Sequence, residues 1–162
     1  MKKLTFLLIA MVLFLMTGCS NTNRVEQGTE DPVTPSKEAT ADSENIFQVK
    51  EYTLQLPEQW PGNYAVDIYE EEGVTSWVAF YAAGCHKETE AGWLFSIGRY
   101  EDMDYMDLPA YQFLAEQEGV SYIAVYPTDV QTEDASEIAK EQYYELLQGV
   151  EEVVDSFRFI EP

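Results

Sequence analysis

Trp77-Val78-Ala79-Phe80-Tyr81 and Trp93-Leu94-Phe95-Ser96-Ile97 are the two stretches that decide the fold. Both are apolar at nearly every position, whereas a strand with one face in water alternates apolar and polar residues. We therefore expect two central strands of a sheet, each with apolar contacts on both faces. The charged segment that separates them, from Gly84 to Gly92, predicts a loop and makes the strands antiparallel neighbours.

Further strands are expected on either side of this pair. Residues 52–56 alternate apolar and polar side chains, which indicates a half-buried strand that ends at the following proline. Residues 64–68 repeat the alternation and lead through the turn 70–73 into the first central strand, so a hairpin is expected. Two weaker strands, 111–116 and 120–126, form a last pair. The pattern predicts an antiparallel sheet of five or six strands.

From Asp134 onward the spacing of apolar residues changes from two to about three and a half, which indicates an amphipathic helix. Asp134 is suited to cap its N-terminus, with Glu137 reaching back to the cap. Gly149 should weaken or split the helix at a cost of about 1 kcal/mol. A sheet covered on one face by a C-terminal helix is an α+β fold. The expected apolar face of the helix consists of Ile138, Tyr143, Leu146, Val150, Val153 and Phe157.

The charge balance limits the partners of the chain. Its formal net charge is -21, while 46% of its residues are hydrophobic and 14% are aromatic. That hydrophobic content is enough for a folded core, so we expect the charge on the surface. Nucleic acids need a basic surface, and anionic lipid headgroups repel an acidic one, so neither is an expected partner. The basic residues that follow residue 45 are Lys50, Lys87, Arg99, Lys140 and Arg158.

The N-terminus has the parts of a secretion signal. Met1-Lys2-Lys3 is positively charged, and residues 4–16 are almost entirely apolar but shorter than the roughly 20 residues that span a bilayer. An uncleaved N-terminal helix is the alternative. With Leu15-Met16-Thr17-Gly18-Cys19, the segment resembles the lipobox of bacterial lipoprotein precursors. The resemblance implies removal of the signal peptide 1–18 and attachment of acyl chains such as palmitate to Cys19. The protein would then lie on the cell membrane, facing outside the cytoplasm.

The composition changes again after the lipobox. Residues 19–45 are rich in Thr, Glu, Ser, Pro and Asn, and Val25 and Val33 are their only large apolar residues. Too little apolar surface is present to order this segment, so it predicts a disordered tether. As a random coil it would hold the domain about 25–30 Å from its anchor on average. Residues 46–162 are expected to form a single globular domain.

Two short motifs in this domain are similar to the PsbP-like α/β sandwich. One is Tyr52-Thr53-Leu54-Gln55-Leu56-Pro57-Glu58-Gln59-Trp60, and the other is Val153-Val154-Asp155-Ser156-Phe157. In that group a strand followed by Pro and Trp opens the domain, and a helix that ends in Ser-Phe closes it. The resemblance implies a fold seen in small secreted lipoproteins and no particular activity, because members of one fold can differ in function.

Cys85-His86 is the first candidate for chemistry. Adjacent residues in an extended segment point to opposite faces, so a catalytic pair is disfavoured and a structural role is expected. No CxxC or HxxxH pattern supports zinc. An unpaired thiol outside the cytoplasm is either buried or kept in a reducing habitat.

Carboxylates and aromatic rings supply the other candidates. Asp102, Asp104 and Asp107 lie close together in the sequence and could gather calcium, but they lack the glycine and terminal glutamate of an EF-hand. A solvated acidic loop is the alternative. Trp60, Tyr105 and Tyr111 are candidates for contact with a ligand, whereas Trp77 and Trp93 are expected to be buried. Aromatic rings with an acidic rim suit cationic peptides, choline-like groups or sugars.

These observations favour an extracytoplasmic, lipid-anchored binding or accessory module, because the anchor and tether come without a catalytic set or a cofactor motif. Its partner would be an extracellular protein, a cationic peptide or a sugar, and the oligomeric state stays open. The alternative is a small hydrolase that acts on glycans outside the cell through paired carboxylates, which an acidic chain offers in number. A passive spacer or assembly protein, marked by a large exposed apolar patch, is a third hypothesis.

Overall fold

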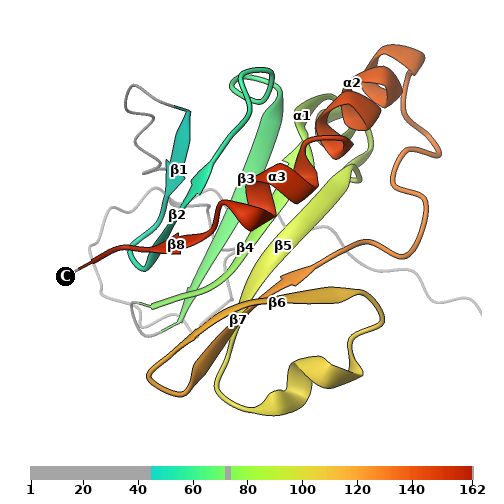
Figure 1. Cartoon of the computed structure of the whole chain (residues 1–162). Coiled ribbons are helices and arrows are strands. Elements are labelled where there is room, and N and C mark those ends of the chain that lie inside the picture. The colour runs from blue at the N-terminus through green and yellow to red at the C-terminus, as the bar shows by residue number, and fades with distance from the viewer. Residues whose placement is uncertain (1–44, 72–73, 162) are drawn as a thin grey trace, which may run out of the picture. The chain divides into compact units, whose positions relative to one another are not determined.

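Five antiparallel strands form the larger of two sheets in this α+β protein, in the order β3-β4-β5-β7-β6. The computed structural model describes residues 45–71 and 74–161 (Figure 1). The predicted signal peptide, the lipid attachment at Cys19 and the tether up to residue 44 lie outside the described residues. The strands are β3 (Tyr64–Glu71), β4 (Val74–Ala82), β5 (Trp93–Tyr100), β6 (Tyr111–Gln117) and β7 (Val120–Val125).

The prediction of two central strands is confirmed, because β4 and β5 lie inside the sheet. Val78 pairs with Ile97 and Phe80 pairs with Phe95, so apolar side chains of both strands share one face. The Phe80 and Phe95 rings stack with their centroids 4.6 Å apart. The predicted hairpins between β3 and β4 and between β6 and β7 are also confirmed.

The prediction of a single sheet is wrong, because the strand near residue 52 belongs to a second, three-stranded antiparallel sheet. Its order is β1 (Ile46–Gln48), β2 (Tyr52–Gln55) and β8 (Arg158–Phe159). The outer strands are only 3 and 2 residues long, too short to show a hydrophobic period. Pairing between β2 and β8 brings Tyr52 opposite Phe159 and so joins the two ends of the domain.

The predicted loop between the central strands is a helix over most of its length, α1 (Ala83–Thr89). Cys85 anchors this helix and is 0% exposed, while Lys87 and Glu88 face water. The helix ends at Glu90, which adopts the left-handed conformation with φ of 61°. Gly92 follows with φ of 88°, and a Cβ atom there would lie 2.6 Å from the Cβ of Cys85. The charged residues that suggested a loop form the exposed side of the helix.

The predicted C-terminal helix is split in two, as its glycine suggested. The parts are α2 (Glu137–Leu147) and α3 (Val150–Asp155), and Gly149 is the N-cap of α3. The predicted cap of α2 is wrong: Ser136, rather than Asp134, accepts a hydrogen bond from the backbone N–H of Ala139. Ile138 was expected on the buried face but is 81% exposed.

One hydrophobic core joins both sheets with the helices. α2 contacts β4 and β5, and α3 contacts β2 (Figure 1). Side chains from all these elements belong to one buried cluster, so each helix contributes apolar contacts to the sheets. Its larger fully buried members include Phe47, Tyr52, Leu54, Trp60, Phe80, Leu94, Phe95, Ile97, Leu146 and Val153. A short 3-10 helix, η1 (Met103–Asp107), follows β5 and contacts that strand.

Candidate functional site

The five-stranded sheet has a second face, opposite the core, which we call the outer face. Successive side chains of a strand point to opposite faces, and directly paired residues share a face. Phe80 points into the core, so Trp77, Ala79 and Tyr81 of the same strand belong to the outer face. Strand register and ring contacts together place eight aromatic side chains there: Tyr69, Trp77, Tyr81, Trp93, Tyr100, Tyr105, Tyr111 and Phe113.

One row of the outer face crosses the whole sheet. Tyr69 of β3 pairs with Trp77 of β4, and Trp77 pairs with Gly98 of β5. Gly98 pairs with Ile123 of β7, which in turn pairs with Phe113 of β6. The row therefore begins and ends with an aromatic ring on each edge strand.

Gly98 allows the rings in the middle of this row to come together. A Cβ atom at Gly98 would lie 2.6 Å from Cζ3 of Trp77 and 2.7 Å from Cε2 of Tyr100. Real Cβ atoms do not approach so closely, so the two rings occupy the space above the glycine. Ile123 is 0% exposed without belonging to the core cluster. The outer face thus has its own buried layer, over which the aromatic rings lie.

The helix η1 adds a further ring to the outer face. Tyr105 packs edge-on against Tyr100, with ring centroids 5.9 Å apart, and against Tyr111, at 5.6 Å. Two of the three aromatic residues predicted for ligand contact, Tyr105 and Tyr111, are therefore brought together. The third, Trp60, lies in the core with 0% exposure.

The rings of the outer face are accessible to different degrees. Tyr69, Phe113 and Tyr111 are 47%, 48% and 38% exposed. Trp77 and Trp93 were expected to be buried but are half-buried, as is Tyr105, which was expected to be exposed. A ligand on this face would therefore meet ring surfaces that are held in place by their neighbours.

The charges at this face are negative. In the described strands of the five-stranded sheet the only basic residue is Arg99, and it pairs with Tyr122 on the core side. Asp67 pairs with Ala79 and so lies on the outer face. Burial raises the pKa of Tyr81, and the nearby carboxylate of Asp67 raises it further. The outer face therefore combines aromatic rings with carboxylates and carries no cation on its described strands.

The structure does not assemble the predicted calcium ligands. Asp102, Asp104 and Asp107 are all exposed. Within residues 45–71 and 74–161, no three side chains of His, Cys, Asp or Glu gather closely enough to hold a metal ion. These aspartates therefore add negative charge beside η1.

A separate groove of about 710 Å³ opens at the far end of β5, beside the turn between β6 and β7. Arg99 donates a hydrogen bond to Oε1 of Glu101 at 2.8 Å, which occupies one carboxylate of the groove. Oε2 of Glu51 is buried and has no hydrogen-bond partner among the described residues. The residues that line the groove include Glu51, Val74, Arg99, Glu101, Asp102, Glu118 and Tyr122. The groove is acidic, with one guanidinium.

Cys85 and His86 do not form a catalytic pair. They lie in a helix rather than in the extended segment that was expected, and their side chains have different neighbours. The Cys85 thiol lies 3.3 Å from the carbonyl oxygen of Ala139, to which it donates, while the His86 ring stacks on Tyr81 with centroids 4.2 Å apart. Burial and the charge of Glu88 raise the pKa of Cys85, which disfavours the reactive thiolate.

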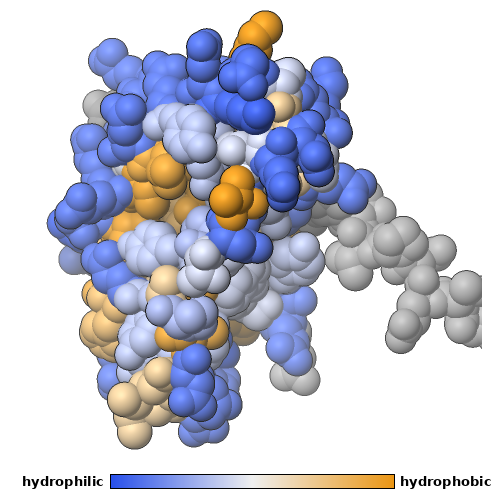
Figure 2. All heavy atoms as spheres, turned by 90° about the vertical axis from the view of Figure 1, so that its right-hand side faces the viewer, coloured by the Kyte–Doolittle hydropathy of each residue, from blue (hydrophilic) through white to orange (hydrophobic). Residues whose placement is uncertain are grey.

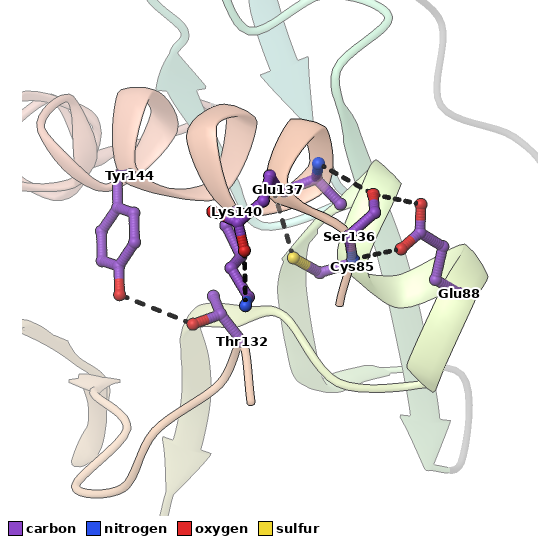
Figure 3. A network of polar contacts seen from close by, with 8 residues as sticks. Cys85, Glu88, Thr132, Ser136, Glu137, Lys140 and Tyr144 are labelled. Carbon is purple, nitrogen blue, oxygen red and sulfur yellow. Dashed lines mark hydrogen bonds and ion pairs between the residues drawn. The ribbon is translucent and has the colours of Figure 1, made fainter. Parts of the chain in front are cut away.

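The contacts around Cys85 fasten α1 to α2 (Figure 3). The carboxylate of Glu88 accepts hydrogen bonds from the backbone N–H of Ser136 at 2.7 Å and from its hydroxyl at 2.8 Å. These bonds lower the pKa of Glu88 and complete the N-terminal cap of α2. In the same region Lys140 and Glu137 form an ion pair at 3.0 Å. The network is structural, and its partners are 48 residues apart in the chain.

Exposed apolar side chains elsewhere on the domain are scattered. Figure 2 shows the side that carries the segment between β7 and α2, where apolar patches are separated by hydrophilic surface. The most exposed apolar residues are Ile138 at 81%, Val130 at 73% and Met103 at 70%. They belong to α2, to a connecting segment and to η1. The outer face therefore remains the surface on which aromatic rings gather.

No helix among the described residues is long and apolar enough to cross a membrane. Comparison with protein-family models, with curated proteins and with solved structures finds no match to this chain. Function must therefore be inferred from the chemistry of the outer face and of the groove.

The sequence suggested only part of this site. Tyr69, Trp77, Gly98, Tyr100 and Phe113 were not predicted as site residues, because their common face depends on which strands pair and in which register. The alternation of Trp77, Ala79 and Tyr81 along β4 was the signal that pointed to a second face.

Proposed function

We propose that this domain is a non-catalytic binding module that holds its ligand on the outer face. Eight aromatic side chains share that face, three of them are exposed, and this gathering is the observation that supports the proposal. Exposed ring faces offer large, stiff contact areas, and their burial by a ligand is favourable. The described residues bring together no nucleophile and base, since Cys85 and His86 face different partners.

A thermal-shift panel of peptides, sugars and small cations is the first test of this function. A ligand that binds on the outer face should lose affinity in a Trp77→Leu variant, because that ring lies in the middle of the aromatic row. Tyr144→Ser is the matched control, since Tyr144 is a 53% exposed tyrosine on α2. Equal loss in both variants, or a panel without any shift together with an empty pull-down from envelope extracts, would contradict a binding role for this face.

We further propose that the domain is anchored outside the cytoplasm by a lipid on Cys19. The lipobox resemblance supports this, and the polar segment after Cys19 is suited to hold the domain away from the membrane surface. Labelling of cells with an alkyne fatty acid should mark the protein and should fail in a Cys19→Ala variant. Label that persists in the variant would overturn the anchor.

The PsbP-like sandwich, with C-terminal helices over one face of the sheet, is proposed as the fold family. In support, the two motifs that carry the resemblance touch. The Ser156 hydroxyl accepts a hydrogen bond from the backbone N–H of Gln55 at 2.8 Å, and the Phe157 ring packs on Tyr52 with centroids 4.9 Å apart. An experimental structure whose strand order differs from that of PsbP-like domains would contradict this assignment.

A hydrolase that acts on glycans is the second candidate, favoured by the groove. Glu51 and Glu101 both line this opening, and paired carboxylates are what glycoside hydrolysis requires. Hydrolysis of a panel of cell-wall glycans should then be lost in Glu51→Gln and in Glu101→Gln, and retained in Glu141→Gln on α2. Activity that survives both groove substitutions would exclude the groove as an active site.

A further inference from the structure

We infer that the ligand of the outer face is an extended, arginine-rich peptide segment. This inference rests on the proposed function and adds the chemical class of the partner. Three features of the outer face support it: its charge, the accessibility of its rings and the length of its aromatic row.

Charge selects a cationic ligand. Asp67 lies on the outer face, and Glu70 and Glu71 continue the same edge strand as exposed residues. At the other edge, Glu116 of β6 is exposed. No described strand places a basic residue on this face. Since the whole chain has a formal net charge of -21, its field attracts polycations and repels polyanions.

The rings favour arginine among the cations. A guanidinium is planar and weakly hydrated, so it stacks on an aromatic face, whereas the ammonium of lysine is compact and strongly hydrated. Tyr69 and Phe113 expose 47% and 48% of their surface at the two ends of the row. Trp77, between them, is the ring type that gives the strongest cation–π contact. Carboxylates nearby can accept the N–H groups at the guanidinium edge.

The length of the row fits a peptide segment. Neighbouring strands lie about 4.8 Å apart, so a row across five strands spans about 19 Å. An extended chain advances about 3.3 Å per residue, and about six residues therefore cover the row. Successive side chains of such a segment alternate in direction, so every second side chain would face the rings. A single choline-like group would occupy only one of the exposed rings.

A fluorescence titration of the full chain tests the inference, because Trp77 and Trp93 lie on the outer face. The probes are hexa-arginine, hexa-lysine, hexa-glutamate, choline and the neutral sugar cellohexaose. Hexa-arginine should bind several-fold more tightly than hexa-lysine, and hexa-glutamate should not bind. Raising the salt concentration should weaken hexa-arginine binding, since screening shortens the range of the field, but a preference for arginine over lysine should remain.

Two matched pairs of variants locate the binding. Tyr69→Ser should weaken hexa-arginine binding about twofold to fivefold, as expected for one exposed cation–π contact. Tyr144→Ser removes a tyrosine of similar exposure from α2 and should leave the affinity unchanged. Asp67→Asn should weaken binding more than Glu141→Gln, although both remove one negative charge. Tyr69 and Tyr144 are both exposed, so neither substitution is expected to prevent folding.

Several outcomes would overturn the inference. Equal affinity for hexa-lysine and hexa-arginine, or equal loss in Tyr69→Ser and Tyr144→Ser, would show diffuse attraction by charge alone. Binding of cellohexaose that depends on Tyr69 would keep the outer face as a binding site and refute the cationic ligand. Choline binding as tight as that of hexa-arginine would refute an extended segment. Absence of binding by every probe would contradict the inference and weaken the proposed function.

Discussion

Trp60 offers the sharpest test of how the core is built. The sequence placed it among candidate ligand contacts, but its side chain is 0% exposed. Its ring packs near Tyr64, Phe80 and Phe95, with centroids between 5.9 and 6.3 Å away. A Cβ atom at Gly149 would lie 3.0 Å from Nε1 of Trp60, so the break between α2 and α3 passes directly over the indole. The expected effect of Trp60→Ala is therefore a loss of stability.

The size of that loss follows from the burial. An aromatic side chain buries about 150–250 Å², and about 25 cal/mol per Å² gives about 4–6 kcal/mol for the whole ring. Direct measurements of Trp-to-Ala substitutions in cores fall at about 3–5 kcal/mol. Since domains are stable by only about 5–15 kcal/mol, Trp60→Ala should remove a third of the stability or more.

Trp60→Phe is the matched control. It keeps a ring in the core and removes the Nε1–H group, which has no hydrogen-bond partner among the described residues. An unpaired buried donor costs about 1–3 kcal/mol, and this gain offsets the smaller ring. We expect a change below about 1.5 kcal/mol. Urea denaturation followed by circular dichroism measures both variants. A loss below 1 kcal/mol for Trp60→Ala, or equal losses for the two variants, would refute this account of the core.

Three further predictions concern other parts of the domain. In a Cys19→Ala background, Cys85 should react with a thiol reagent only after unfolding, because it is buried and its pKa is raised; rapid reaction of the native protein would contradict its placement. The pKa of Glu88 is lowered in the folded state, so its stabilising effect is present above its ordinary pKa of 4.5 and is lost as the pH falls through the folded value. Glu88→Gln should therefore reduce the acid dependence of the melting temperature, and Glu141→Gln should not. Gly98→Ala should displace the Trp77 ring and shift its fluorescence to the red, whereas an unchanged spectrum would contradict the close packing over Gly98.

The parts of the fold that could be predicted are those that depend on nearby residues. β4 and β5 were recognised because strands buried on both faces are apolar throughout, and the helix break was recognised because glycine disfavours a helix locally. The three-stranded sheet depends instead on the pairing of Tyr52 with Phe159, at opposite ends of the domain. A strand as short as β8 has no period that a sequence can display.

The candidate site shows the same limit. Trp60 and Trp77 both stand among apolar and aromatic neighbours in the sequence, and nothing local tells which of them faces water. The register between β4 and β5 places Trp77 over Gly98 on the outer face, while the break at Gly149 covers Trp60. Both placements result from contacts between distant residues, so the sequence could propose aromatic residues as ligand contacts without choosing the correct ones.

The acidity of the chain and its aromatic outer face are best understood together. Exposed rings on a sheet with two free edge strands, β3 and β6, favour association between copies of the same protein. Glu70 and Glu71 on one edge and Glu116 on the other are exposed, and copies that carry a net charge of -21 repel each other before their edges can pair. The same charge attracts a cationic segment to the rings. Negative charge can therefore keep an apolar binding surface free of self-association and also select its partner, so the two properties need no separate explanations.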